Sequence, residues 1–406
     1  MRACVAAGSL PAAAGPRRRV TVAAGWGGFH LPRVGAAAAS KLTPGKLFVF
    51  GLGYTGLGAA SFFQQRGWEV AGTVRSEDKV DRLAQRGISA FHFDPTDFDN
   101  LGGKALDCLR HATHVLSTVP PDADNDIDPV IMAHAQQLSE HADLFKWVGY
   151  ISSTSVYGDW EGEWVDETSE LRAAGGKGWS RVMAEHEWLA LHDNFGLPVH
   201  VFRCGGIYGP RRSALDSVQR GGGGSANAAR RAQQRYTARC HVYDICQTLE
   251  ASMRHPRPGA AYNIADDDPA DRATVMAFAA ELLERRAAGL PLQPAVPGDG
   301  PGGWAVPVSS MSAAASGASS SSYDSGDEGG LLSAALRPRD RGASSGRMRR
   351  SDARQAAAAA AAVREALAEK RVSNALIKKE LGVQLQFPTY REGLSAIAAG
   401  DMRPFS

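Results

Sequence analysis

The sequence predicts an α/β fold, in which a doubly wound parallel sheet carries a small C-terminal lobe. Three observations predict this fold. An apolar run at residues 47–50 leads directly into three glycines in Gly-x-Gly-x-x-Gly spacing. Segments with strand and helix patterns then alternate as far as residue 155, which is typical of a parallel sheet covered by helices. The chain has 406 residues, enough for one large or two ordinary domains.

The glycine-rich turn is the segment around which this fold is expected to form. Gly51 permits a tight turn, Gly53 lets the backbone approach a pyrophosphate, and Gly56 lets the following helix lie close to the strand. The helix N-terminus offers free N–H groups and the positive end of a dipole. Taken alone, the motif could also be a turn without a ligand. The alternating strands favour a dinucleotide site that includes Tyr54 and Thr55.

The other elements of the first half follow in order along the chain. Short apolar runs predict strands, and the segments between several of them have helical patterns. Asp94-Pro95 and Pro120-Pro121 mark the ends of two strands. The predicted strands span 69–73, 88–93, 113–119 and 145–152, and the predicted helices span 59–66, 79–86 and 129–141.

The end of the strand at 69–73 indicates the type of cofactor. An NAD site usually has a carboxylate there, bonded to the ribose hydroxyls. This chain has Arg75 and Ser76 instead, and no acid before Glu77. A guanidinium can pair with a 2′-phosphate, so we expect NADP(H) rather than NAD(H). A solvated surface arginine is the alternative. Asp94 is expected either to meet the adenine or to serve only as a turn carboxylate before Pro95.

The second half is predicted to complete the sheet and to add the lobe. Helices are expected at 180–192 and 272–283 and strands at 199–203 and 262–265, with the acidic turn at 266–268 capping the later helix. Residues 289–358, rich in Pro, Gly, Ser and Ala, are expected to be a disordered insertion. Two C-terminal helices are expected at 372–382 and 390–399. The predicted regions are 42–210 for the nucleotide-binding half, 211–288 for the lobe and the last sheet elements, and 359–406 for the C-terminal helices.

Residues 1–41 have the composition of an organelle transit peptide. They contain no acid, carry an Arg17-Arg18-Arg19 run, and lack the hydrophobic segment of a secretory signal. The segment Arg19 to Ala24 resembles a stromal processing site, which favours the chloroplast stroma, with the mitochondrion as the alternative. An Ala/Gly-rich tail without function is the third interpretation.

Composition argues against several other classes of protein. A net charge of +2 gives no support to a nucleic-acid binder, and no apolar run is long enough to span a bilayer. Five scattered cysteines do not form a disulfide framework, and no metal-ligand spacing is present.

Five motifs in order along the chain carry a family resemblance. They are the glycine-rich turn, Ser-Ser-Thr-Ser-Val-Tyr-Gly at 152–158, Ser-Arg-x-x-Ala-Glu at 180–185, Arg-x-x-Gly-Ile-Tyr-Gly-Pro at 203–210, and His-Val-x-Asp-Ile at 241–245. Together they resemble the extended or atypical short-chain dehydrogenase/reductase superfamily, and the chain looks most like epimerase/dehydratase-like NAD(P)-binding proteins of plant, algal and bacterial type. The resemblance covers about residues 46–285, with a last piece near 370–399, and implies a Rossmann-like fold.

The resemblance also implies where catalysis would occur. In the superfamily a tyrosine moves a proton, a lysine four residues later holds the ribose, and a Ser or Thr polarises the substrate oxygen. These positions fall on Lys177, Arg181 and Ser153, so the tyrosine is missing. Arg181 could still hold the ribose, but it cannot give up its charge near neutral pH. Tyr157 and Lys177 are the candidate substitutes as proton donor, and a packed, structural role is the alternative for Tyr157.

On the substrate side, the resemblance implies that Tyr208 lines the pocket, and that Arg212 and Arg239 could meet a phosphate, a diphosphate or a carboxylate. Two functions follow. The first is an NADP(H)-dependent epimerase/dehydratase-like oxidoreductase acting on a hydroxyl or carbonyl substrate, with sugar nucleotides as one candidate. The second is a non-catalytic NADP(H)-binding protein, either a redox sensor or a partner subunit. The expected partners are a small-molecule substrate and, by analogy with relatives, a second copy of the chain.

Overall fold

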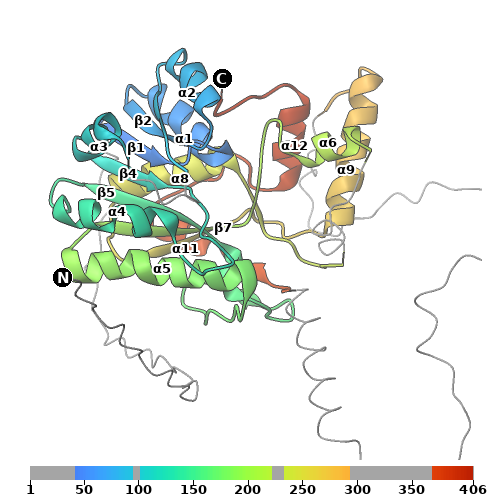
Figure 1. Ribbon diagram of the computed structural model, residues 1–406. Coiled ribbons are helices and arrows are strands. Elements are labelled where there is room, and N and C mark those ends of the chain that lie inside the picture. Colours follow the sequence, from blue (N-terminus) through green and yellow to red (C-terminus); the bar gives the residue numbers. More distant parts are fainter. Residues whose placement is uncertain (1–41, 95–100, 222–232, 293–367, 406) are drawn as a thin grey trace, which may run out of the picture. The chain divides into compact units, whose positions relative to one another are not determined.

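The central sheet of the computed structural model contains seven parallel strands among the residues described, which are 42–94, 101–221, 233–292 and 368–405 (Figure 1). Their order across the sheet is β10-β7-β5-β4-β1-β2-β3. Because every pairing is parallel, all the carboxyl ends lie along one edge. The strands are β1 (Lys46–Phe50), β2 (Glu69–Val74), β3 (Ser89–His92), β4 (His114–Ser117), β5 (Trp147–Ser153), β7 (Val199–Cys204) and β10 (Ala261–Ile264).

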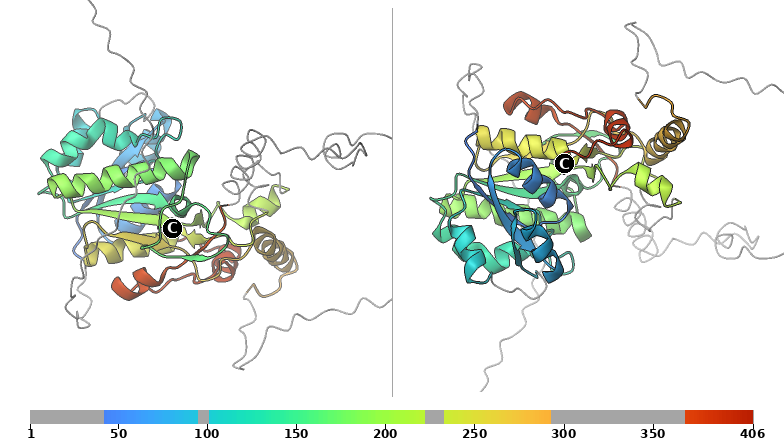
Figure 2. Two further views of the ribbon diagram at one scale, coloured as in Figure 1. Left: turned by 90° about the horizontal axis from the view of Figure 1, so that it is seen from below. Right: turned by 90° about the horizontal axis from the view of Figure 1, so that it is seen from above.

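Helices cover both faces of this sheet, so the predicted doubly wound, Rossmann-like fold is confirmed (Figure 2). One face packs against α1 (Tyr54–Gln64), α2 (Glu77–Ala84), α8 (Val242–Arg254) and α11 (Ala375–Glu380). The other face packs against α3 (Gly103–Arg110), α4 (Pro129–Glu140) and α5 (Gly176–Phe195). The alternation of side chains along β1 explains the two layers, since Leu47 and Val49 face one core and Phe48 and Phe50 the other.

Local sequence signals account for the ends of several helices. Asp128 caps α4 by accepting hydrogen bonds from the N–H groups of Val130 and Ile131, and proline occupies the first helical position. Gly196 ends α5 in the left-handed conformation, with φ of 71°. The N-terminus of α9 differs from the expectation. Asp271 caps it by accepting from the N–H of Thr274, whereas the expected cap, the acidic turn at 266–268, lies before the helix and does not cap it.

A second group of elements forms the small lobe. It consists of the parallel pair β8 (Gly206–Tyr208) and β9 (Arg239–His241) with α6 (Ala214–Gln219), α9 (Arg272–Ala287) and α12 (Tyr390–Ala398). Leu215, Val275 and Leu394 are among the residues of its shared apolar core. Capping boxes begin α6 at Ser213 and α12 at Thr389. The three helices lie together beside the sheet in Figure 1.

The helix expected at 372–382 is shorter than the sequence predicts. Arg371 and Val372 form strand β11, which pairs in parallel with β6 (Trp164–Val165). The helix begins only at Ala375 and ends before Gly382, whose φ is 65°. This pairing also holds the acidic segment at 159–167 against residues near the C-terminus. Asp159, for example, accepts a hydrogen bond from the N–H of Glu369.

A buried ion pair joins α5 to the sheet. The guanidinium of Arg203 on β7 lies 2.8 Å from the carboxylate of Glu185, and both side chains are almost wholly buried. Ser152 at the end of β5 donates to the same carboxylate. Arg203 also donates to the hydroxyl of Tyr157 at 3.0 Å, and that hydroxyl donates to Asn263 on β10 at 2.7 Å. Three of the motifs seen in the sequence therefore converge on one polar network.

The C-terminal residues lie against the first helix of the sheet. The ring of Phe405 is 5.2 Å from that of Tyr54, and Gln65 donates to the carbonyl of Pro404 at 3.2 Å. A Cβ atom on Gly58 of α1 would lie 3.3 Å from Pro404, so glycine makes room for this contact. The last residues of the chain therefore complete the packing of α1.

Several expectations fall outside the described residues, namely those for residues 1–41 and for 293–358. The domain boundaries stay predictions. Within the part of the chain that the structure describes, no helix is both long and apolar enough to cross a membrane. The same part contains no group of three or more His, Cys, Asp or Glu side chains placed to hold a metal ion.

Candidate functional site

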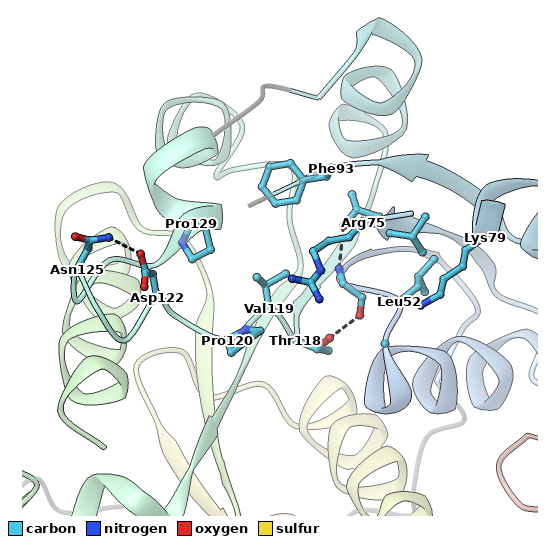
Figure 3. Close-up of a pocket in the computed structure, with 14 residues that line it drawn as sticks. Leu52, Arg75, Lys79, Phe93, Thr118, Val119, Pro120, Asp122, Asn125 and Pro129 are labelled. Carbon is cyan, nitrogen blue, oxygen red and sulfur yellow. Dashed lines mark hydrogen bonds between the residues drawn. The ribbon is translucent and has the colours of Figure 1, made fainter. Parts of the chain in front are cut away.

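A pocket of about 510 Å³ opens at the carboxyl ends of β1, β2 and β4 (Figure 3). In this sheet β1 lies between β2 and β4, so the chain reverses its winding direction at this point. Such a switch point is where open α/β sheets bind their ligands. The pocket is lined by Gly51, Leu52, Gly53, Thr73, Val74, Arg75, Lys79, Phe93, Thr118, Val119, Pro120, Asp122, Asn125 and Pro129.

The glycine-rich turn has the geometry that the motif predicts. Gly51 has φ of 86°, a conformation that favours glycine. Its N–H donates to the hydroxyl of Thr73 at 2.9 Å, and its carbonyl accepts from the hydroxyl of Thr118 at 2.6 Å. A Cβ atom on Gly56 would lie 2.2 Å from the carbonyl oxygen of Gly51, so only glycine permits this approach of helix and strand.

The backbone at Gly53 is open toward the pocket. No atom lies within 4 Å of the place where a Cβ atom would be, and the residue is exposed. Together with the N-terminus of α1, this open turn fits the pyrophosphate of a dinucleotide. Tyr54 and Thr55, expected at the same site, do not line the pocket. Thr55 is buried, and the hydroxyl of Tyr54 donates to the carbonyl of Pro210 at 3.1 Å.

Two cations stand on the β2 side of the pocket. Figure 3 shows the side chain of Arg75 extending into the pocket and Lys79, from the first turn of α2, beside Leu52. Sequence reasoning missed Lys79, although it lies only one helical turn beyond Arg75. Ser76 is the N-cap residue of α2 and does not line the pocket.

The residues that line the rest of the pocket differ in part from those expected. Phe93 lines the pocket in place of its neighbour Asp94. Asp122 is the acidic residue of the lining, and it lies beyond β4, where Asn125 donates to its carboxylate at 2.6 Å. The rule that parallel strands end at one edge could have identified Thr118, since it follows β4 directly.

Two of the predicted catalytic residues make hydrogen bonds near the carboxyl end of β5. Ser153 is the last residue of that strand, half-buried, and its hydroxyl oxygen accepts from the N–H of Ser155 at 3.2 Å. Arg181 reaches across from α5 and donates to the carbonyl of Ile151 at 3.0 Å. Lys177 is exposed on the first turn of the same helix, and it makes no hydrogen bond or ion pair with the described residues.

Tyr157, one candidate substitute as proton donor, does not line the pocket. The side chain is fully buried, and its hydroxyl is held by Asn263 and Arg203 in the network described above. Burial raises the pKa of this phenol to about 12. A phenol so enclosed has no open path to a substrate and releases its proton poorly near neutral pH. The geometry agrees with the alternative, structural interpretation of Tyr157.

A second cavity of about 280 Å³ lies in the small lobe, and it brings together Tyr208, Arg212 and Arg239. These are the three residues that the resemblance placed at the substrate. Two further arginines, Arg220 and Arg272, complete the basic lining and were not anticipated. The cavity is lined by Gly206, Ile207, Tyr208, Arg212, Ser213, Ala214, Ser217, Arg220, Thr237, Arg239, Arg272, Val275, Met276, Tyr390 and Leu394.

Tyr54 contacts a residue that lines the cavity of the small lobe. It follows Gly53 of the glycine-rich turn, and the guanidinium of Arg212 lies 5.1 Å from the centre of its ring. A Cβ atom on Gly209 would lie 2.6 Å from the Tyr54 hydroxyl, so glycine is needed there. The side chain of Tyr54 therefore links the glycine-rich turn to the segment that carries Arg212.

Comparison with known proteins gives consistent matches. The model of the NAD dependent epimerase/dehydratase family matches residues 47–265. Protein YeeZ of Escherichia coli K12 is 29% identical over 229 residues, which are 54% of this chain and 77% of that protein. A functionally unknown conserved protein from Silicibacter pomeroyi has a solved structure with 34% identity and a TM-score of 0.59, and the match covers 88% of this chain and 99% of that one.

A more distant structure shares the fold alone. It is dTDP-glucose 4,6-dehydratase from Bacillus anthracis in complex with NAD, with 13% identity and a TM-score of 0.54. The match covers 87% of this chain and 95% of that chain.

The glycine-rich turn yields a matched pair of predictions. Gly56→Ala should lower the free energy of unfolding by about 1–3 kcal/mol, because its methyl group would overlap the Gly51 carbonyl. Gly53→Ala should change stability by less than about 0.5 kcal/mol but should weaken NADPH binding, since its methyl group enters open space at the turn. Denaturant melts and NADPH titration would measure both. Equal destabilisation by the two variants would contradict this account.

Proposed function

This chain belongs to the NAD dependent epimerase/dehydratase family, and from that premise we propose that it is an NADP(H)-dependent oxidoreductase acting on a hydroxyl or carbonyl substrate. The observation that carries the proposal is the pocket at the switch point. It joins an open glycine-rich turn to two cations, Arg75 and Lys79, in the region that a dinucleotide's ribose would reach.

The two cations favour a phosphorylated ribose. The residues that line the pocket from β2 and α2 include no carboxylate, the group that would bond the ribose hydroxyls of NAD. A guanidinium can donate two parallel hydrogen bonds to a phosphate, and an ammonium beside it adds a point charge. Arg75 would therefore hold the 2′-phosphate, with Lys79 as its second cation.

Cofactor preference can be tested at Arg75. Arg75→Asp should weaken NADPH binding by about tenfold to a hundredfold, because it replaces a charged donor with a repelling carboxylate. NADH binding should be unchanged or improved. Lys79→Gln should produce a smaller loss for NADPH alone.

Arg82→Gln is the matched control for this experiment. Arg82 lies on the same helix, α2, and does not line the pocket, so this variant should bind both nucleotides as the wild type does. Titration of each purified variant with NADPH and NADH gives the ratios. An unchanged NADPH-to-NADH preference in Arg75→Asp would rule out the assignment.

The chain's own residues define what chemistry could occur. A bound nicotinamide would supply or accept a hydride. The Ser153 hydroxyl lies at the end of β5, where it could donate a hydrogen bond to a substrate oxygen. Arg181, which donates to the carbonyl of Ile151 on the same strand, could hold the ribose. Among the described residues, Lys177 is the titratable side chain at the tyrosine position of the family, and it is exposed on the first turn of α5.

A non-catalytic NADP(H)-binding protein is the second candidate function. It is favoured by a specific pair of observations, the replacement of the family's tyrosine by the exposed Lys177 and the burial of Tyr157. Under this proposal the dinucleotide pocket would still bind NADPH, while the group that transfers the proton would be missing.

Turnover assays distinguish the two candidates. Oxidation of NADPH would be followed with aldehydes, quinones and sugar nucleotides as substrates. If the protein is an enzyme, Ser153→Ala should reduce kcat by about 10²-fold or more, whereas Tyr157→Phe should mainly lower stability by about 1–3 kcal/mol through the lost hydrogen bond. Tight NADPH binding without turnover of any substrate would favour the second candidate. A loss of kcat in Tyr157→Phe without loss of stability would contradict the structural role of this tyrosine.

The proposal extends to the substrate, the assembly and the location of the protein. The relative named dTDP-glucose 4,6-dehydratase makes sugar nucleotides one candidate substrate class. A homodimer rests on analogy with the superfamily. The basic, acid-free segment 1–41 favours import into the chloroplast stroma, with the mitochondrion as the alternative. A fluorescent fusion of residues 1–45 that stays in the cytosol would contradict import.

A further inference from the structure

The side chain of Tyr54 lies where two other parts of the chain come together. Its hydroxyl donates to the carbonyl of Pro210 at 3.1 Å, and the guanidinium of Arg212 lies 5.1 Å from the centre of its ring. The ring of Phe405, near the end of the chain, lies 5.2 Å away. Burial raises the pKa of the Tyr54 phenol well above its usual range, so the hydroxyl keeps its proton and stays a hydrogen-bond donor.

The backbone of the same residue belongs to the glycine-rich turn. The carbonyl of Gly53 accepts the first hydrogen bond of α1, from the N–H of Leu57 at 2.8 Å, and Tyr54 is the first residue of that helix. Gly53 lines the dinucleotide pocket. A pyrophosphate bound at Gly53 and at the N-terminus of α1 would restrict the backbone of the next residue. Tyr54 therefore has its backbone beside the dinucleotide pocket and its hydroxyl on Pro210.

The segment that Tyr54 holds is a strained turn at residues 209–212. The N–H of Gly209 donates to the carbonyl of Arg212 at 3.1 Å, and the N–H of Arg212 donates back at 3.0 Å. Arg211, the third residue of the turn, has φ of 64°. A positive φ at this position occurs in type II turns, where glycine or asparagine is favoured. An arginine there is strained, so the turn keeps its shape only while surrounding contacts hold it. The hydrogen bond from Tyr54 to Pro210 is such a contact.

The turn leads directly into the small lobe. Ser213 is the next residue, and it begins α6 with a capping box. Arg212, Ser213 and Ala214 all line the cavity of about 280 Å³ in that lobe. The shape of the turn therefore determines where α6 begins and where part of the cavity wall lies.

We propose that Tyr54 is a positioning residue that couples occupancy of the dinucleotide pocket to the conformation of the 209–212 turn and of the small-lobe cavity beyond it. A bound dinucleotide restricts the backbone of Tyr54, which keeps the hydroxyl on Pro210 and the strained turn in place. Without the dinucleotide, the same hydrogen bond opposes the strain alone, and the turn opens more often. The inference rests on the proposed function in one respect, namely that a dinucleotide binds at the glycine-rich turn.

Amide hydrogen exchange of the full chain, with and without saturating NADPH, tests the coupling in peptides from residues 206–221. In the wild type, NADPH should slow exchange there by about twofold to tenfold, the factor that one neutral hydrogen bond supplies. Tyr54→Phe keeps the ring, and with it the contacts to Arg212 and Phe405, but removes the hydroxyl. In this variant exchange should be faster without nucleotide, and NADPH should no longer slow it.

A rescue variant separates coupling from a general loosening of the structure. Asparagine tolerates a positive φ better than arginine, so Arg211→Asn relieves the strain at an exposed position. Added to Tyr54→Phe, it should restore slow exchange in the turn even without nucleotide. Tyr236→Phe is the matched control, because this tyrosine packs against Arg235 and Arg371 and not against the turn. It should show the same protection by NADPH as the wild type.

NADPH titration of each variant shows separately whether the dinucleotide pocket is intact. If NADPH binds but does not protect residues 206–221 of the wild type, the coupling is overturned while the proposed function stands. Equal protection in Tyr54→Phe and wild type, loss of protection in Tyr236→Phe, or failure of Arg211→Asn to slow exchange in the Tyr54→Phe background would also overturn it. A wild-type protein that binds no NADPH would overturn both proposals.

Discussion

The buried ion pair between Arg203 and Glu185 is the interaction on which the arrangement of the ligand-binding edge depends. A guanidinium and a carboxylate taken out of water cost several kcal/mol each unless they are paired and their remaining donors and acceptors are satisfied. Here Ser152 donates to Glu185, and Arg203 donates to the hydroxyl of Tyr157, which in turn donates to Asn263. Since the participants come from β5, β7, β10 and α5, the network holds the carboxyl ends of three strands and one helix in fixed positions.

That network gives two of the sequence motifs a physical role. Glu185 and Arg203 belong to motifs that carry the family resemblance, yet neither lines either of the two cavities described. Their ion pair and its hydrogen bonds fix the position of α5 relative to β5. That position determines where Ser153 and Arg181 lie. Tyr157 belongs to the same network, which agrees with the structural interpretation of this residue. A tyrosine in a motif near the site can have a structural role instead of a catalytic one, and its hydrogen-bond partners show which role it has.

Local signals predicted the fold well and the cavities only in part. The apolar run at β1, the glycine spacing and the alternating elements predicted the sheet, because each depends on neighbours in the chain. Arg75 could be predicted from the end of β2, and Tyr208, Arg212 and Arg239 from a family resemblance. Lys79, Arg220 and Arg272 could not, because their positions depend on how separate helices dock. Val372 was assigned to a helix because its pairing with Val165 lies far away in the sequence.

The contact of residues 404 and 405 with α1 has a consequence for folding. Gln65 and Pro404 are 339 positions apart, and Gly58 leaves room for Pro404. Contacts between residues so distant in sequence slow folding, because the long intervening loop must close before they form. The packing of α1, the helix that follows the glycine-rich turn, therefore includes a contact that local folding of β1 and α1 cannot make by itself.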